Sequence, residues 1–262
     1  MRGGHRAGSV VLVLAGLAVL PVIFELAPRL GLLPADSFPP TSEVVDALVR
    51  LLADPAYWAA VRDTLTGWAV ASALALVLGV ILGVAIGASR VGHLLARVTI
   101  DFLRPIPSVA LIPLLVLVFG TRPQLKIALG LFGGLFPVLF QAMYGVQDID
   151  PVARDTARSF GLGRLAVLRW LVVPTCLPFI ATGARLAASV ILLLVVTGEY
   201  VVGVAGIGRA VLDAQSSGAY DVMYAYVITA GLLGLAINAV LVRVERRLLF
   251  WHPSQRSVAA VA

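Results

Sequence analysis

The chain has 262 residues, of which 60% are hydrophobic and only 13% are charged, and its mean hydropathy is +0.99. This composition excludes an ordinary soluble domain, in which about a quarter of the residues are charged, and it indicates a protein of the lipid bilayer. The formal net charge of +6 does not indicate a nucleic-acid partner here, because the basic residues cluster between apolar segments, as membrane topology requires.

Six apolar segments have the length of membrane-crossing helices, which need roughly 20 residues to cross the hydrocarbon core. They cover about residues 9–26, 66–88, 98–120, 127–144, 179–197 and 223–241. We therefore predict an all-α, multi-pass integral membrane protein with about six transmembrane helices in a single domain over residues 1–262. The first segment follows basic residues, as in a signal peptide, but no convincing cleavage site follows it, and we interpret it as an uncleaved helix.

The region between the first two spans is polar and contains several prolines, the last at Pro40, and an amphipathic helix is predicted to begin near Thr41. Its apolar residues form one stripe: Val44, Val45, Leu48, Leu51 and Leu52. Such a helix lies along the membrane or packs on the spans. Acidic residues outnumber basic ones in this region, which suits the outer side of the membrane.

Glycine and proline give two of the spans a distinctive backbone. In the second span, Gly79, Gly83 and Gly87 recur at four-residue spacing, which favours close helix packing over a substrate site. The third span contains three prolines: Pro105, Pro107 and Pro113. Prolines free backbone carbonyls that must find other partners, so this span is expected to face a cavity or pathway.

A few polar residues lie inside the predicted spans or at their edges. Ser108, Gln141 and Thr197 are candidates for the solute pathway, although each can equally satisfy a neighbouring backbone group. Arg185 lies well inside the fifth span, where an arginine must face the bundle interior, a cavity or a carboxylate, or reach an interface. We interpret Arg185 as a structural residue.

The segment from Asp150 to Pro178 is a long polar break between apolar segments that carries its own helical pattern. Asp150 can cap a helix that has Pro151 at its first position and ends before Gly161. Four residues share one face at the spacing i, i+3, i+4 and i+7, namely Ala153, Thr156, Ala157 and Phe160, with Arg154 and Arg158 at the side. The pattern predicts a docking element for another protein; the alternative is an amphipathic helix lying on the membrane surface.

This segment resembles the EAA motif of ABC importer permeases, in which Glu-Ala-Ala, three residues and Gly are followed after nine residues by Ile-x-Leu-Pro. The matching residues are Asp155-Thr156-Ala157, Gly161 and Leu171-Val172-Val173-Pro174, with Asp155 in place of Glu and Thr156 in place of the first Ala. Residues 104–120, RPIPSVALIPLLVLVFG, are similar to the third-span signature of the sulfonate, taurine and nitrate branch. Glu199 with Gly206-Ile207-Gly208 resembles the Ala-Glu and Gly-Leu-Gly element of the family.

The resemblance implies the type I ABC importer permease fold, in which residues 150–170 form a cytoplasmic coupling helix seated in a cleft of an ATPase subunit. It implies that the ATPase is contacted by Arg154, Asp155, Ala157, Arg158, Phe160 and Gly161. Glu199, Gly206 and Gly208 are implied to lie at the outer gate, near an extracytoplasmic solute-binding protein. A sulfonate, taurine, nitrate or similar small solute is the implied cargo.

The resemblance also implies several partners. It implies no cofactor bound by this chain itself. The partners are cytoplasmic ATPase subunits, a second permease subunit as in a homodimer, the solute-binding protein and membrane lipid. ATP and Mg²⁺ are expected in the ATPase subunit. The basic residues are more numerous on the side that holds both predicted termini, the 89–97 loop and the coupling loop, so we expect these parts in the cytoplasm, with the chain in a bacterial plasma (inner) membrane.

The sequence does not support an intramembrane enzyme. Its histidines, at positions 5, 93 and 252, fall in predicted loops or tails, and Cys176 has no candidate base beside it, so neither a nucleophilic nor a metal site is expected. An ion-coupled secondary transporter is the alternative function. Such a protein usually shows internal repeats and mid-span carboxylates, whereas here the acidic residues crowd the span ends and no repeat is visible.

Overall fold

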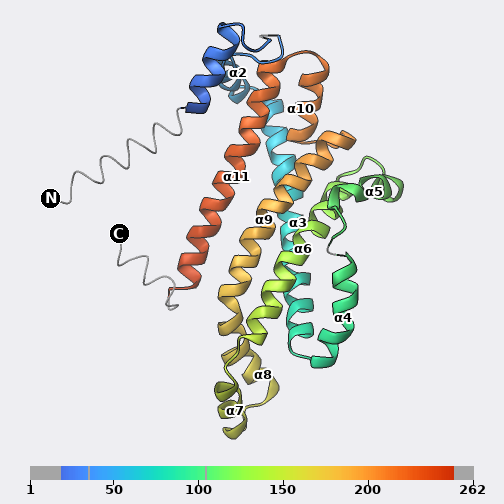
Figure 1. Ribbon diagram of the computed structural model, residues 1–262, viewed down its shortest axis with the longest axis vertical. Coiled ribbons are helices and arrows are strands. Elements are labelled where there is room, and N and C mark those ends of the chain that lie inside the picture. The colour runs from blue at the N-terminus through green and yellow to red at the C-terminus, as the bar shows by residue number, and fades with distance from the viewer. Residues whose placement is uncertain (1–18, 35, 104, 251–262) are drawn as a thin grey trace, which may run out of the picture.

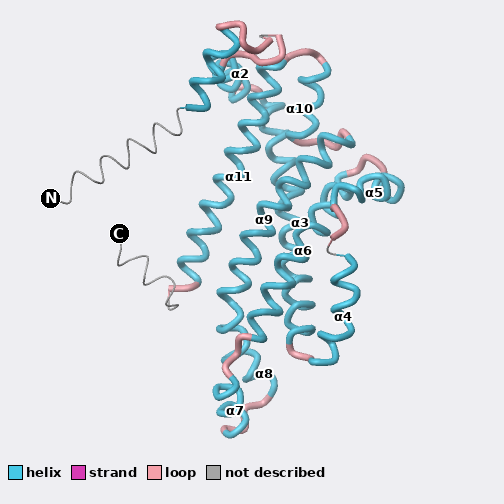
Figure 2. Tube along the Cα trace, viewed as in Figure 1, coloured by secondary structure: helices cyan, strands magenta, loops and turns pink. Residues whose placement is uncertain are grey.

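The computed structural model describes residues 19–34, 36–103 and 105–250, and within these ranges it contains helices, turns and loops but no strand (Figure 1). Figure 2 shows how short the connections between the helices are. A helix over residues 19–29 comes first. The elements that follow are α2 Thr41–Leu52, α3 Pro55–Gly87, α4 Arg90–Leu103, η1 Ser108–Leu111, α5 Ile112–Phe119, α6 Pro123–Gln147, α7 Pro151–Ser159, α8 Arg164–Val167, η2 Leu168–Val172, α9 Val173–Val202, α10 Ile207–Ser216 and α11 Tyr220–Leu248.

Within the described residues, four helical stretches are long and apolar enough to cross a membrane: Pro55–Gly87, Pro123–Gln147, Arg164–Ser216 and Tyr220–Leu248. They include the predicted spans 127–144, 179–197 and 223–241 in full, and 66–88 to within one residue. Most of the predicted first span, 9–26, lies outside the described residues. The helix α3 begins well before the predicted apolar segment, and its first turn is capped by the side chain of Asp54.

The segment 98–120, predicted as one span, is not a single helix. The chain forms α4, leaves the helical path around Pro105 and Pro107, and then forms the short elements η1 and α5. Proline has no backbone N–H and its ring clashes with the preceding turn, so two prolines at this spacing end α4. The expected loop at 89–97 is also mostly helical, since α4 begins at Arg90.

The helices α3, α6 and α9 form the core and run side by side along the molecule (Figure 1). Their buried contacts are made largely by small residues of α3, such as Ala71 and Ala75, against Val138 of α6 and Ile191 of α9. A Cβ atom on Gly79 would lie 2.7 Å from Cβ of Val138, so the glycine repeat of α3 is a packing seam against α6, as predicted.

The molecule has two distinct ends. At one end, α2 packs on the start of α11 through buried Val44, Ala47 and Ala225, with α10 nearby (Figure 1). The apolar stripe predicted for α2 is only partly buried, because Val45 is 50% exposed. At the opposite end, α7 and α8 extend below the ends of α3 and α6 (Figure 1).

Candidate functional site

The helix α7 begins and ends at the residues that the sequence indicates. The backbone N–H of Val152 donates a hydrogen bond to Oδ1 of Asp150 at 2.8 Å, so Asp150 caps the first turn and Pro151 occupies the first helical position. A capping carboxylate satisfies a backbone donor that the helix itself leaves unpaired. This end of α7 is therefore fixed by local chemistry alone.

The other end of α7 closes in a Schellman motif. Leu162 N–H donates to the carbonyl of Ala157 at 3.0 Å, and Gly161 N–H donates to the carbonyl of Arg158 at 2.9 Å. This motif requires a left-handed residue after the last helical turn, and Gly161 has φ +64°. No atom lies within 4 Å of the position that a Cβ on Gly161 would occupy, so the glycine is needed for its backbone angle and not for space.

The burial of residues in α7 does not follow the single face that the sequence spacing predicts. Ala157 is only 7% exposed, so its side chain packs against its own chain and supports the helix from within. Because successive helical residues are about 100° apart, Val152 and Asp155 lie on the opposite, outward face. Both are exposed, and Phe160 is 79% exposed at the end of the helix. The exposed surface of α7 thus includes Val152, which the motif does not indicate.

The connection from α7 to the core helix α9 passes through a widened turn. α8 leads into η2, a π-helical turn over Leu168–Val172, and this turn continues directly into α9. Pro174 lies in the first turn of α9 and cannot donate to the carbonyl four residues earlier. A π-helical turn is a known way of absorbing such a defect without breaking the helix. The Pro174 end of the EAA-like segment is therefore continuous with a membrane-spanning helix.

At the opposite end, Thr64 of α3, Lys126 of α6 and Glu199 of α9 form a buried group that we call the Lys–Glu cluster. The side chains of Lys126 and Glu199 are 3% and 0% exposed, and Nζ of Lys126 lies 2.6 Å from Oε1 of Glu199. The ammonium also donates to the carbonyls of Asp63 at 2.9 Å and Ala205 at 2.7 Å. All three of its donors are thus used, which a buried cation requires.

The Lys–Glu cluster also holds the start of α10. The hydroxyl of Thr64 donates to Oε2 of Glu199 at 2.8 Å and accepts from the backbone N–H of Ile207 at 2.9 Å. The N–H of Gly208 donates to Oε2 of Glu199 at 3.1 Å. The N–H of Gly208 at the start of α10 thus points directly at a buried anion, and the N–H of Ile207 is linked to it through the Thr64 hydroxyl, at the helix end where the dipole stabilises negative charge.

The predicted glycines Gly206 and Gly208 let the loop approach this carboxylate. Gly206 has φ +147°, and a Cβ on it would collide with the carboxylate of Glu199. A Cβ on Gly208 would lie 2.7 Å from Cβ of Glu199. The structure thus brings Glu199, Gly206 and Gly208 together, as the sequence element suggests, but around a buried ion pair.

Sequence reasoning missed Lys126 and Thr64. The predicted fourth span begins only after Lys126, at residue 127, whereas Lys126 lies in the first turn of α6 and is buried. Two signals could have found it: it is the only lysine of the chain, and Glu199 at the end of an apolar span needs a cation nearby. Gly67 makes room for it, since a Cβ there would lie 2.8 Å from Cε of Lys126.

The three pathway candidates are not gathered into one site. Ser108 lies in η1 and faces α6, with its Oγ 3.3 Å from the position of a Cβ on Gly133. Gln141 lies farther along α6, against Gly183 of α9. Thr197 donates to the carbonyl of Leu193 in its own helix at 2.7 Å. The described hydrogen bonds join no two of these three residues, so their place in a pathway stays a prediction.

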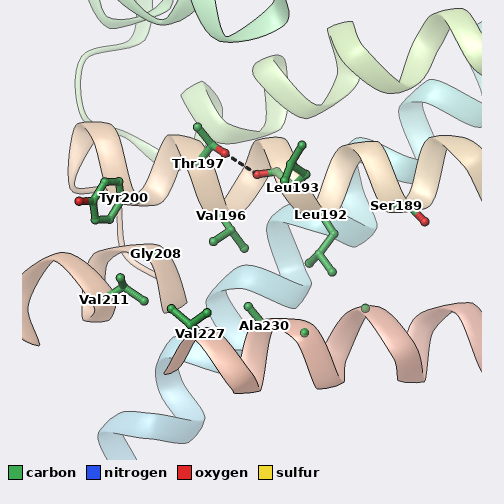
Figure 3. A pocket seen from close by; sticks show the side chains of 12 residues that line it. Ser189, Leu192, Leu193, Val196, Thr197, Tyr200, Gly208, Val211, Val227 and Ala230 are labelled. Carbon is green, nitrogen blue, oxygen red and sulfur yellow. Dashed lines mark hydrogen bonds between the residues drawn. The ribbon is translucent and has the colours of Figure 1, made fainter. Parts of the chain in front are cut away.

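A pocket of about 490 Å³ lies between α9, α10 and α11. Figure 3 shows Leu192 and Val196 of α9 pointing towards Val227 and Ala230 of α11, while Thr197 points away from α11. The lining is almost entirely apolar, so this pocket has the character of a helix-packing or lipid-facing gap and not of a polar solute site. On the same face, Arg185 pairs with Glu245 of α11 at 3.5 Å, a structural contact between spans.

The family model described as binding-protein-dependent transport system inner membrane component matches residues 75–250, which include α6, α7, α9 and α10. The chain belongs to this family. It is the membrane permease subunit of an ABC importer, a transport protein and not an enzyme, and ATP is hydrolysed by a separate ATPase subunit. The alternative of an ion-coupled secondary transporter is not supported.

The permease resembles named relatives over most of its length. It is 32% identical over 234 residues, 88% of each chain, to an Escherichia coli K12 protein named as the aliphatic sulfonates transport permease SsuC. It is 29% identical to the taurine transport system permease TauC of the same organism, covering 93% of this chain and 90% of TauC. The nitrate import permease NrtB of Leptolyngbya laminosa is 27% identical, over 76% and 74% of the two chains.

Solved structures show the same fold. An inward-facing MetNI methionine ABC transporter matches with a TM-score of 0.63 at 19% identity, covering 74% of this chain and 98% of that one. The transporter involved in import of the acidic polysaccharide alginate matches with a TM-score of 0.64 at 18% identity, covering 93% and 96%. These likenesses confirm the predicted type I importer permease fold, with the third span broken as described above.

Proposed function

We propose that the permease acts as a homodimer that imports a small oxyanion, such as a sulfonate, taurine or nitrate, with two cytoplasmic ATPase subunits and an extracytoplasmic binding protein. The observation that carries the solute class is the 32% identity to SsuC over 88% of both chains. TauC and NrtB, named for taurine and nitrate, agree with it in chemical class.

In this proposal α7 is the coupling helix, and it lies in the cytoplasm together with both chain termini. Arginine is concentrated at this end, in α7, α8 and the last turns of α11, as is usual for the cytoplasmic side. Arg154, Asp155, Arg158, Phe160 and Gly161 contact the ATPase, and Phe160, with 79% exposure, is the anchor residue. Ala157 supports the helix from its inner face.

The connection between α7 and the Lys–Glu cluster explains how ATP binding reaches the outer gate. From η2 onward the chain is helical for the 30 residues of α9, or about 45 Å, and Glu199 lies near the far end. A displacement of α7 therefore tilts α9 as a body. Because the cluster ties α3, α6, α9 and α10 together, Glu199, Gly206 and Gly208 move as one gate element between two discrete arrangements.

The test of coupling is co-purification of the permease with its ATPase in mild detergent. Gly161→Asp forces a side chain into a left-handed backbone and is expected to abolish the complex. Gly163→Ala is the matched control, because Gly163 is exposed two residues away with φ −65° and open space around it. Retention of the ATPase by Gly161→Asp, with transport intact, would overturn the coupling assignment.

The solute class and pathway are tested by ATP-dependent uptake in proteoliposomes that contain the permease, the ATPase and the binding protein. Sulfonates, taurine or nitrate are expected to accumulate, and uptake of uncharged or cationic solutes alone would refute the proposal. Ser108, Gln141 and Thr197 are proposed to line the pathway. Alanine at all three positions is expected to change rate or solute range, and an unchanged profile would remove them from it.

A further inference from the structure

A groove of about 530 Å³ lies between α7–α8 and the ends of α3 and α6. Three arginines form one wall: Arg154 and Arg158 from α7 and Arg164 from the start of α8. The opposite side is apolar and is formed by Val84 of α3, Val146 of α6 and Val172 of η2. Cationic and apolar surfaces therefore meet in one hollow, where the spans end.

The arginines of this groove are largely unneutralised. Arg158 lies 3.4 Å from Asp155, but both side chains are more than 70% exposed, which makes this a weak, solvent-screened pair. Arg154 and Arg164 have no ion-pair partner within the described part of the chain. Guanidinium groups are suited to bind phosphate through paired hydrogen bonds, so the wall is complementary to a phosphate-bearing anion.

The apolar side indicates that the ligand also carries a hydrocarbon part. Val84 and Val146 lie in the last turns of two core helices, next to the membrane, and Leu168 of the groove is 42% exposed. Trp170 is 71% exposed in the same segment, with the guanidinium of Arg169 5.5 Å from its ring centre. An exposed tryptophan at the end of a span is typical of the lipid headgroup level.

We propose that this groove binds an anionic phospholipid of the inner leaflet, with its phosphate held mainly by Arg164 and flanked by Arg154 and Arg158, which lie between the groove and the ATPase-facing side of α7, and with its first acyl carbons on the valines. Basic pockets between membrane helices on the cytoplasmic side have this lipid chemistry. The proposal rests on the proposed cytoplasmic position of α7. The lipid fills the space between α7 and the spans, so it stiffens the connection through which α7 moves α9.

The test is native mass spectrometry of the purified permease titrated with phosphatidylglycerol or with zwitterionic phosphatidylcholine. The unmodified protein is expected to bind one phosphatidylglycerol at least tenfold more tightly than phosphatidylcholine. Arg164→Gln and Arg154→Gln are each expected to weaken phosphatidylglycerol binding roughly fivefold. Arg169→Gln is the matched control, because Arg169 is a nearby arginine that does not line the groove, and it is expected to bind normally.

Two further measurements distinguish lipid binding at the groove from binding of a free anion and from contact with the ATPase. Inorganic phosphate in millimolar excess is expected to leave the lipid bound; displacement by phosphate would show a free-anion site and overturn the lipid assignment. ATPase retention is measured on the same samples. If Arg164→Gln releases the ATPase but leaves lipid binding unchanged, the groove belongs to the protein interface and the proposal fails. Equal binding of both lipids by all variants also refutes it, whatever the ATPase does.

Discussion

Lys126 and Glu199 are almost fully buried and their hydrogen bonds involve four helices and the loop before α10, whereas the charged pair of α7, Arg158 and Asp155, is about three-quarters exposed on each side. The buried pair fixes the positions of the helices around it through several hydrogen bonds. The exposed pair leaves its side chains accessible to other molecules. Burial and exposure of the same kinds of residue thus distinguish a part of the permease that is held by its own contacts from a part whose charged side chains face the surroundings.

Lys126→Met is the substitution with the largest expected effect on this contrast. It leaves the Glu199 carboxylate buried without a cation, which is expected to lower the free energy of unfolding by about 3–5 kcal/mol. A fall in the melting temperature on the order of 10 °C should appear in thermal unfolding followed by tryptophan fluorescence in detergent. Lys126→Met with Glu199→Gln should recover part of the loss, since no charge is then unpaired. If Lys126→Met melts at the same temperature as the unmodified protein, the Lys–Glu cluster has no structural role.

Gly206→Ala tests how closely the loop must approach the carboxylate. The new Cβ meets Glu199 and the backbone angle is unfavourable, so the expected loss of stability is about 2–4 kcal/mol. Gly218→Ala is the matched control, because Gly218 has φ +74° but open space, and backbone strain alone costs about 1–2 kcal/mol. If the two variants melt at the same temperature, the contact with Glu199 contributes nothing.

Asp150→Ala probes the opposite end and should leave global unfolding unchanged. Loss of the cap is expected to cost α7 about 1 kcal/mol of local stability. The measurement is amide hydrogen exchange, which should become faster over residues 151–160 only. Asp150→Asn keeps a capping oxygen and should exchange like the unmodified protein; faster exchange throughout the spans would show that α7 is coupled to the core more tightly than its exposure suggests.

Asp155→Ala should have the smallest effect on stability and the clearest effect on assembly. Removal of an exposed pair costs less than about 0.5 kcal/mol, so the melting temperature should not change measurably. Co-purification of the ATPase should nevertheless weaken, because Asp155 lies on the outward face of α7. Asp148→Ala removes another exposed carboxylate, just before α7, and should retain the ATPase fully. Equal retention by both variants would argue against an outward contact at Asp155.

Local patterns in the sequence were sufficient for much of the fold. The spans near 66–88, 127–144, 179–197 and 223–241 follow from apolar length, and the bounds of α7 follow from Asp150, Pro151 and Gly161, because caps and left-handed glycines act on their own neighbours. The prolines around Pro105 indicated that the backbone of the third span is irregular, but only the structure shows that they end α4.

Contacts between distant segments could not be predicted in this way. Periodicity groups Ala153 with Ala157 but does not say whether that face points inward or outward, which depends on the helices above it. The pairing of Lys126 with Glu199 joins two spans that are far apart in sequence, and Thr64 joins from a third. A single sequence does not show which distant residues come into contact. It shows only that a buried charge needs a partner.

The widened turn at Leu168–Val172 accommodates an extra residue as well as a proline. A π-helical turn holds one residue more than an α-helical turn, so the helices on its two sides keep their relative direction although the sequence between them is longer. Deleting one residue from regular α-helix in α9 would instead rotate α7 by about 100° about the line of α9 and turn Asp155 and Phe160 away from their present direction. The π-helical turn is thus the part of this connection where the chain length can change by one residue while α7 keeps its direction.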